Sequence, residues 1–151
     1  MKLEELNLNR SLIKAIREMG YEEPTEIQEK CIPLILGGKD IFGQSKTGSG
    51  KTAAFGLPIL ENIKTGAGIQ ALILTPTREL CVQVTQALND FGKYLQIKAV
   101  SVYGGVSIEP QIRDIKKADI VVGTPGRVQD HLDRKTVSFQ NIKFLVLQNQ
   151  R

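Results

Sequence analysis

Ten residues in the first third of the chain have the composition of a phosphate-binding loop. The segment Gly43-Gln44-Ser45-Lys46-Thr47-Gly48-Ser49-Gly50-Lys51-Thr52 lies between the apolar pair Ile41-Phe42 and the helix-like run Ala53-Ala54-Phe55. Backbone N–H groups at a helix start have no partner within the helix, and the helix dipole adds partial positive charge there. The segment therefore predicts a site for a phosphate group between a strand and a helix.

Glycine, lysine and threonine each suit one task in such a loop. Gly48 and Gly50 let the backbone come close to phosphate oxygens, Lys51 supplies a positive charge, and Thr52 offers a hydroxyl to Mg²⁺. Ser45 stands where the strict Walker A pattern has glycine, so the segment is a variant of that pattern. A Gly/Ser turn with an exposed lysine is the alternative interpretation.

Three further segments combine small or hydroxyl residues with an aromatic residue or an arginine, and each follows an apolar run. They are Thr75-Pro76-Thr77-Arg78, Tyr103-Gly104-Gly105 and Gly123-Thr124-Pro125-Gly126-Arg127. Such residues suit a sugar-phosphate backbone better than base edges. Two of the segments lie at predicted helix starts, at Thr77 and Pro125, where free N–H groups could bind phosphate oxygens. Each segment alone could equally be a structural turn, and the arginine of the first could pair with a neighbouring carboxylate.

Strands and helices alternate along the chain and would position these segments. Apolar runs predict strands at 69–75, 99–103, 119–122 and 144–147, and helical spacing predicts helices at 9–20, from Thr25 to Gly37, after the phosphate loop, and at 77–95, 106–115 and 125–132. The alternation predicts a three-layer α/β/α fold with a mainly parallel sheet and ligands at the carboxyl ends of the strands. Pro58 should kink the helix that follows the phosphate loop.

Length and composition are those of one ordinary globular domain. The chain has 151 residues, 41% of them hydrophobic and 24% charged, and its net charge of +4 permits binding to a polyanion. No apolar run approaches the roughly 20 residues of a membrane span, so we expect a cytoplasmic protein without a membrane partner. Cys31 and Cys81 are far apart and the single histidine is His131, which favours buried free thiols over a zinc site.

Five motifs together resemble those of the first RecA-like domain of DEAD-box ATP-dependent RNA helicases. The stretch from Gly20 to Gln28 is similar to the Q motif, Ser45–Thr52 to motif I, and Pro76–Leu80 to motif Ia. Gly104-Gly105 matches the glycine motif of the family, and Thr124–Arg127 matches motif Ib. The motifs occur in the family's order and cover essentially the whole chain. The resemblance implies N-terminal helices with the Q motif at 1–36 and a truncated RecA-like ATP-binding domain at 37–151.

The resemblance also implies cofactors, partners and residue roles. ATP and Mg²⁺ would be the cofactors, with Gln28 on the adenine edge, Tyr21 packed near it, and Lys51 and Thr52 serving catalysis, Thr52 also at the metal. The implied nucleotide-binding residues are Tyr21, Gln28, Ser45, Lys46, Thr47, Gly48, Ser49, Gly50, Lys51 and Thr52. One RNA strand would be bound by its backbone, and the implied residues are Pro76, Thr77, Arg78, Gly105, Thr124, Gly126 and Arg127. A second RecA-like domain of the parent protein would be the other partner, while the oligomeric state stays open.

Two positions depart from the family's pattern. Leu3 stands where family members usually carry an aromatic residue that stacks on adenine. After the strand at 144–147 the family continues Asp-Glu-Ala-Asp, whereas this chain continues Gln148-Asn149-Gln150-Arg151. In the family the first Asp holds Mg²⁺ and the Glu positions the attacking water, so neutral amides replace both charges. We therefore expect weak nucleotide binding and negligible hydrolysis.

The end of the chain affects the expected sheet and the choice of function. The resemblance places one further strand of the sheet beyond residue 151, so we expect an incomplete sheet that is less stable than a whole domain or pairs with another chain. Two other functions stay open. A non-catalytic nucleotide- or RNA-binding module is favoured by Gln148 and Asn149, whereas a small-molecule P-loop kinase would leave the segments from motif Ia to motif Ib without a purpose.

Overall fold

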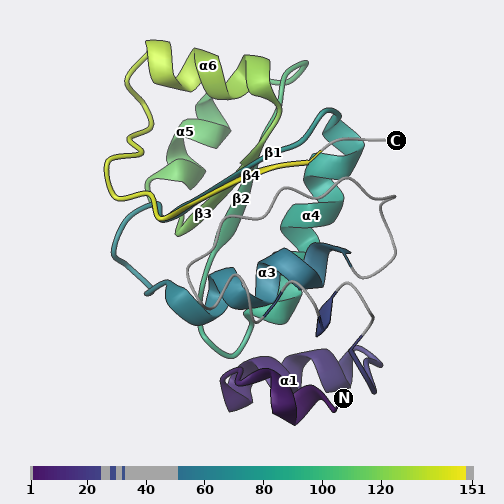
Figure 1. The fold of residues 1–151 in the computed structure, drawn as a ribbon. Coiled ribbons are helices and arrows are strands. Elements are labelled where there is room, and N and C mark those ends of the chain that lie inside the picture. The colour runs from purple at the N-terminus through teal and green to yellow at the C-terminus, as the bar shows by residue number, and fades with distance from the viewer. Residues whose placement is uncertain (1, 25–27, 30–31, 33–50, 149–151) are drawn as a thin grey trace.

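A computed structural model describes residues 2–24, 28–29, 32 and 51–148 of the chain, and of Lys51 only the backbone. In chain order the elements are the 3₁₀ helix η1 (Leu3–Leu6), α1 (Arg10–Glu18), α3 (Lys51–Asn62), β1 (Ala71–Leu74), α4 (Arg78–Phe91), β2 (Ala99–Val102), α5 (Glu109–Ile115), β3 (Ile120–Gly123), α6 (Pro125–Asp133) and β4 (Phe144–Leu147) (Figure 1). The phosphate loop before Lys51 and the predicted strand at Ile41-Phe42 lie outside these residues, as does the start of the helix predicted from Thr25.

The described strands form one parallel sheet in the order β2-β3-β1-β4. The pairing is in register, because Ala71 of β1 lies opposite Ile120 of β3 and Phe144 of β4, and Ala99 of β2 also lies opposite Ile120. All four strands have four residues, so their carboxyl ends are level at one edge of the sheet. The predicted α/β architecture is confirmed.

Helices cover the two faces of the sheet and enclose a core on each. Figure 1 shows α3 and α4 on one side of the strands and α5 and α6 on the other. Alternate residues of β1 serve the two cores, since Ala71 and Ile73 pack with α3 and α4 while Leu72 packs with the opposite cluster. Each large apolar side chain that is fully buried in this way stabilises the fold by about 1.5–3 kcal/mol. Packing in these two apolar cores fixes where the strand ends lie relative to the helices.

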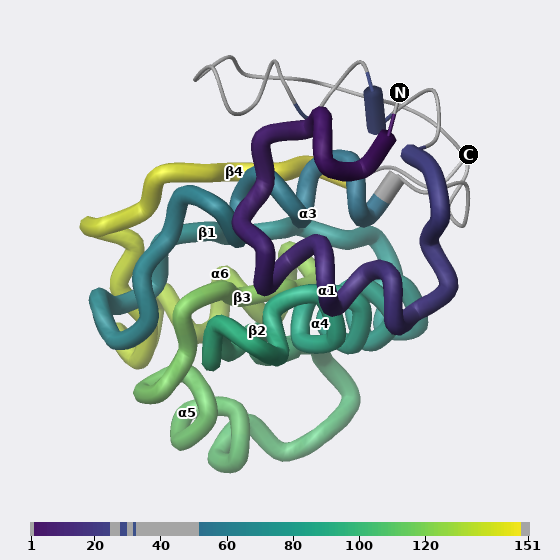
Figure 2. The backbone as a smooth tube through the Cα atoms, turned by 90° about the horizontal axis from the view of Figure 1, so that it is seen from below, coloured from purple at the N-terminus to yellow at the C-terminus, as the bar shows by residue number. Residues whose placement is uncertain are grey.

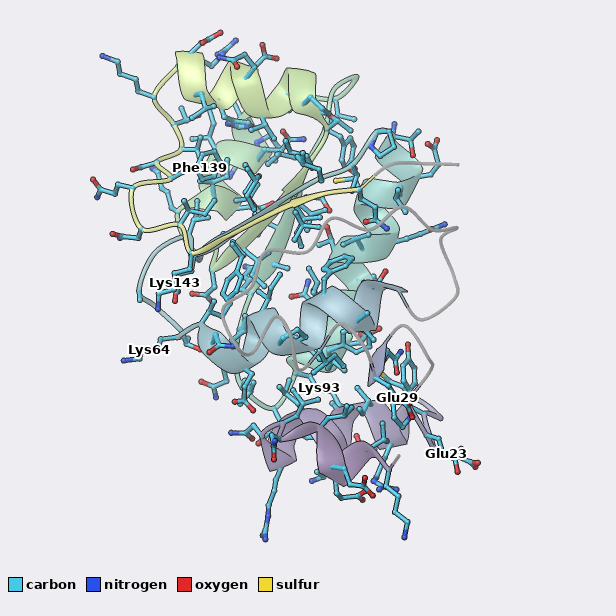
Figure 3. All side chains as sticks on the ribbon, in the orientation of Figure 1. Glu23, Glu29, Lys64, Lys93, Phe139 and Lys143 are labelled. Carbon is cyan, nitrogen blue, oxygen red and sulfur yellow. The ribbon has the colours of Figure 1, made fainter. Side chains whose placement is uncertain are left out.

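The N-terminal elements pack against α4, on the side of the molecule that faces the viewer in Figure 2. The side chain of Asn9 accepts a hydrogen bond of 2.7 Å from the N–H of Ser11, which confirms the predicted cap of α1. Figure 3 shows Lys93 next to α1, where its Nζ lies 2.8 Å from Glu18 Oε1. This ion pair lowers the pKa of Glu18, chiefly through the hydrogen bond from Lys93. The contacts attach α1 to the turn that follows α4.

Several predicted boundaries are wrong by a few residues. The helix predicted at 77–95 ends at Phe91, where Gly92 leaves helical geometry at its C-terminal cap, and the chain then turns through Gln96 at φ 58°. The helix predicted at 106–115 begins only at Glu109, with Pro110 in its first turn, where the missing N–H costs nothing. The strands predicted at 69–75 and 99–103 are shorter than expected, and the strand predicted at 119–122 is shifted by one residue to 120–123.

The remaining structural expectations concern cysteine, proline and the membrane. Cys81 is buried and unpaired, and burial raises the pKa of its thiol, while Cys31 lies outside the described residues. Pro58 lies inside α3, which continues for four residues beyond it, so the kink stays a prediction. No helix in the described part of the chain is long and apolar enough to cross a bilayer.

Candidate functional site

The level strand ends bring together the residues that follow each strand. The N–H of Thr75 donates to the last residue of β3 at 2.9 Å, and the N–H of Thr124 donates to the last residue of β2 at 3.0 Å. The N–H of Gln148 donates to the last residue of β1 at 2.9 Å. Thr75, Tyr103, Thr124 and Gln148 therefore form the next row beyond the sheet. The three segments that the sequence singled out for a sugar-phosphate backbone lie at one edge.

The segment after β1 is fixed by a helix cap and an aromatic contact. Thr77 caps α4, and its hydroxyl accepts a 3.2 Å hydrogen bond from the N–H of Leu80. Arg78 is exposed, and its guanidinium carbon lies 4.9 Å from the centre of the Tyr103 ring. A cation over an aromatic face is attracted by the negative potential of the ring. Arg78 thus links the loops after β1 and β2, and within the described part of the chain it forms no ion pair with a carboxylate. Pro76 beside it is exposed.

The glycine segment after β2 is open to solvent. Gly104 and Gly105 are exposed, and a Cβ built on either would meet no atom within 4 Å. Gly105 has a φ of +81°, a conformation that residues with a side chain rarely adopt. The backbone conformation, rather than a lack of space, therefore requires glycine at position 105.

The segment after β3 places the start of α6 against the sheet. Thr124 is the N-terminal cap residue of α6, and its hydroxyl makes no capping bond. A Cβ on Gly123 would lie 2.4 Å from Val128 Cγ2 and 2.6 Å from Val102 Cγ2, so only glycine allows this close packing. Gly126, in contrast, is exposed and has open space around it.

Arg127 points into the protein. Its side chain is only 11% exposed, and its Nε lies 3.6 Å from Asp130 Oδ2. One terminal nitrogen donates to Gln111 Oε1 at 3.2 Å and the other to the carbonyl of Val106 at 2.9 Å. Arg127 therefore ties the start of α6 to α5 and to the loop after β2.

A buried glutamine and histidine complete this polar cluster, and the sequence did not single them out for function. Gln111 is 6% exposed and donates through Nε2 to the carbonyl of Tyr103 at 3.0 Å, so its Oε1 faces Arg127 and His131 and accepts from both. His131 Nε2 lies 3.1 Å from that oxygen, and its Nδ1 lies 2.8 Å from Thr136 Oγ1. Burial lowers the pKa of His131, and the positive charge of Arg127 adds to this effect. The sequence offered one signal for Gln111: it lies four residues before Ile115, a spacing that puts both residues on the same, buried face of α5.

The expected phosphate site is described only from the helix start onward. The predicted helix after the phosphate loop is α3, which includes Lys51 and Thr52 ahead of the predicted run at Ala53-Ala54-Phe55, and Thr52 in its first turn is half-buried. Figure 1 shows this end of α3 on the same side of the molecule as the carboxyl ends of the strands. Positions 45–50 and the side chain of Lys51 lie outside the described part of the chain. The helix N-terminus and the Thr52 hydroxyl suit a phosphate group and its metal ion.

The expected adenine-binding residues lie near the N-terminal elements. Gln28 is only 1% exposed. Tyr21 is half-buried, its ring packs edge-on against Phe91 with 6.1 Å between centroids, and burial raises the pKa of its hydroxyl. Leu3, at the position that is usually aromatic in the family, is fully buried in the core.

The residue after β4 is a buried amide that has no hydrogen-bond partner among the described residues. Gln148 is 3% exposed, and within the described part of the chain neither its Nε2 nor its Oε1 forms a hydrogen bond. Groups of three or more His, Cys, Asp or Glu side chains that could hold a metal ion are absent from the described residues. Gln148, the polar residue at the end of β4, is neutral because its side chain is an amide.

Comparison with known proteins decides the family. The family model described as DEAD/DEAH box helicase matches residues 25–149. The chain belongs to the DEAD/DEAH box helicase family. It is 53% identical over 149 residues to the ATP-dependent RNA helicase CshA of Limosilactobacillus reuteri, covering 97% of this chain and 30% of that protein.

Solved structures of related proteins agree in fold. A crystal structure of a DEAD box protein from the hyperthermophile Methanococcus jannaschii matches 97% of this DEAD-box chain with a TM-score of 0.93 and 47% identity. A hypothetical ATP-dependent RNA helicase from Sulfolobus tokodaii matches 95% of it with a TM-score of 0.83 and 37% identity. The match covers 41% and 51% of those chains, respectively. The chain thus spans about half or less of the length of these proteins, and the resemblance to RecA-like DEAD-box domains is confirmed.

Proposed function

We propose that this DEAD-box chain is the ATP-binding half of an RNA helicase, which binds ATP at residues 45–52 and the backbone of one RNA strand along the ends of β1, β2 and β3. The level alignment of these three strand ends supports the proposal most, because it brings the loops that follow them to one edge of the sheet. The parent protein would couple ATP binding and hydrolysis to local opening of an RNA duplex in the cytoplasm, together with a second RecA-like domain. The division into residues 1–36 and 37–151 is part of this proposal.

The nucleotide would be held from both ends. Its phosphates would lie at the start of α3, where Lys51 supplies a positive charge and Thr52 a hydroxyl for Mg²⁺. Its adenine would lie near Tyr21 and Gln28. Mg²⁺ neutralises phosphate charge in such sites. The residues described here fit the phosphates better than the metal ion, because Gln148 brings no negative charge to the end of β4.

RNA would lie across the loop edge with its phosphates toward free donors. The exposed guanidinium of Arg78 and the N-termini of α4 and α6, at Thr77 and Thr124, offer such donors. Gly105 and Gly126 leave open space beside them, and Pro76 borders the same surface. The terminal nitrogens of Arg127 carry further N–H groups that would be available to RNA, and one of these nitrogens also donates to the carbonyl of Val106.

A second candidate is a non-catalytic module that binds nucleotide and RNA. The uncharged amide of Gln148, which has no partner among the described residues, favours it, because the family's first Asp would hold Mg²⁺ at this place. Gln148 is followed by Asn149 in place of the water-positioning Glu. Both candidates predict binding by this chain, and both predict negligible hydrolysis by it.

Binding and hydrolysis of a fluorescent ATP analogue test the proposal. We expect Lys51→Ala to weaken nucleotide binding by about tenfold or more, because a charge-assisted contact to phosphate is lost. We expect Arg78→Ala to weaken binding of a single-stranded RNA oligonucleotide, and Arg113→Ala, an exposed arginine late in α5, to serve as its control. Hydrolysis should stay at background with and without RNA. RNA-stimulated turnover that Lys51→Ala abolishes would contradict the expected inactivity.

A further inference from the structure

We infer that Gln111 is a positioning residue that fixes the glycine loop and the start of α6 relative to each other and so sets the shape of the RNA-binding edge. The inference rests on the proposed function for its connection to RNA. Gln111 itself is 6% exposed and lies behind that edge. It would act through the residues that it holds.

The amide of Gln111 joins three segments that are distant in sequence. Its Nε2 donates to the carbonyl of Tyr103 at 3.0 Å, at the beginning of the glycine loop. Its Oε1 accepts from Arg127 at 3.2 Å and from His131 at 3.1 Å, on the first and second turns of α6. Arg127 in turn donates to Val106, at the end of the glycine loop. The loop is thus attached at both ends to one buried polar cluster.

The connection reaches the exposed residues through the backbone and through one ring. Tyr103, whose carbonyl Gln111 holds, carries the ring beneath the guanidinium of Arg78. Gly105 lies two residues further on, in its left-handed conformation. If the Gln111 amide is removed, the Tyr103 carbonyl loses its donor, and Arg127 and His131 lose their acceptor. Buried polar groups left unpaired in this way favour other local conformations, so the loop should open.

The open edge of β2 provides a matched control. The carbonyl of Lys98 accepts a hydrogen bond from the N–H of Ile120 in β3, and the carbonyl of Val102 accepts one from the N–H of Thr124. The backbone N–H and carbonyl groups of the alternate residues Ala99, Ser101 and Tyr103 therefore point away from β3. Asn89 satisfies Ala99, whose N–H donates to Oδ1 at 2.9 Å and whose carbonyl accepts from Nδ2 at 3.0 Å. An amide side chain therefore caps each end of this edge. Of these two amides, only that of Gln111, at Tyr103, also forms hydrogen bonds with α6.

Paired variants of the full chain separate positioning from a general loss of stability. Gln111→Met and Asn89→Leu each replace an amide with an apolar side chain of similar size. We expect Gln111→Met to speed hydrogen exchange of the amides at 103–107 and to weaken binding of a fluorescein-labelled uridine oligonucleotide, each by about tenfold. Affinity for the ATP analogue should stay unchanged. Asn89→Leu should leave both the exchange of this loop and the RNA affinity unchanged.

The outcomes distinguish the inference from the proposed function. Equal exchange and equal RNA affinity in the two variants would overturn the positioning role. If the unaltered chain binds no RNA but Gln111→Met still speeds exchange at 103–107, the proposed function fails and the positioning role stands. Gln111→Glu provides a second test if the methionine variant does not fold, because it keeps the acceptor for Arg127 and loses the donor to Tyr103. Exchange at 103–107 should then rise while α6 keeps its protection, and unchanged loop exchange would contradict the role.

Discussion

Two buried glutamines at the same edge of the sheet behave in opposite ways. Gln111, beside β2 and β3, makes hydrogen bonds with both ends of its amide, whereas the side chain of Gln148, after β4, makes none with the residues that the structure describes. Their exposures of 6% and 3% are similar, so burial does not explain the difference. Among the described residues, the amide on the proposed RNA side is held by internal bonds, although the Nε of Arg127 beside it has no hydrogen-bond partner, whereas the amide on the proposed nucleotide side keeps both of its polar atoms without partners.

A third buried glutamine shows that the fold can satisfy such a group. Gln70, just before β1 at the other end of the sheet, is 2% exposed. Its Oε1 accepts from the N–H of Lys64 at 2.9 Å, and its Nε2 donates to the carbonyls of Lys64 and Gly68. An unpaired buried amide costs about 1–3 kcal/mol. Gln148 is therefore the exception among these three residues.

The largest effect is expected where α6 packs on β3. Gly123→Ala would bring a methyl group within 2.6 Å of Val102 and Val128 side-chain atoms, and overpacking of this kind should lower the free energy of unfolding by about 3 kcal/mol. Urea denaturation measures the change. Gly126→Ala is the control, because a Cβ there meets nothing within 4 Å and alanine favours a helix. Equal stability of the two variants would show that the order of the RNA side does not depend on this close contact.

A pair of isosteric changes should shift stability in opposite directions. Gln148→Met removes an unsatisfied amide and should raise the free energy of unfolding by about 1 kcal/mol, whereas Gln111→Met leaves three groups unpaired and should lower it by about 2 kcal/mol. Both values come from urea denaturation at the same pH. A loss of stability in Gln148→Met would mean that its amide has a partner after all, and the contrast between the two sides would disappear.

The smallest effect concerns pH. His131 packs near Arg127, Asp130 and Arg134, and burial lowers its pKa below the unfolded value of about 6.5. The unfolded chain therefore binds a proton more readily, so this contribution to stability is complete above about pH 6.5 and is lost as the pH falls through the folded pKa, at no more than about 1.4 kcal/mol per pH unit. His131→Gln removes the only histidine. If the free energy of unfolding changes with pH between 5 and 7 by the same amount in this variant, the pH dependence belongs to other groups.

Much of the fold followed from local signals in the sequence. Asn9 predicted the cap of α1, and Thr77 predicted the start of α4. The end of α4 was missed because Leu95 continues the apolar spacing, although Gly92 and the turn after it stop the helix. Leu95 still packs against the core from outside the helix. Periodicity reports which side chains are apolar, and it does not report where the backbone leaves the helix.

The candidate site was predictable where a residue acts through its own type. The phosphate-loop residues and the exposed Arg78 and Gly105 could be proposed from the chain order alone. Gln111 could not, because its role depends on three partners between 8 and 20 residues away in sequence. Arg127 was predicted for RNA, and only the structure revealed its bonds to Gln111 and Val106.

The sequence by itself determined the family, the alternation of strands and helices, and the replacement of the family's Asp and Glu by Gln148 and Asn149. These properties depend on residue identity and order, which are visible in the chain. Only the tertiary structure decided that three loops meet at one edge, that the Gln111 amide forms hydrogen bonds there, and that the Gln148 amide finds no partner among the described residues. Whether a buried polar group finds a partner depends on strand register and on how the helices pack, and neither is encoded by any single segment.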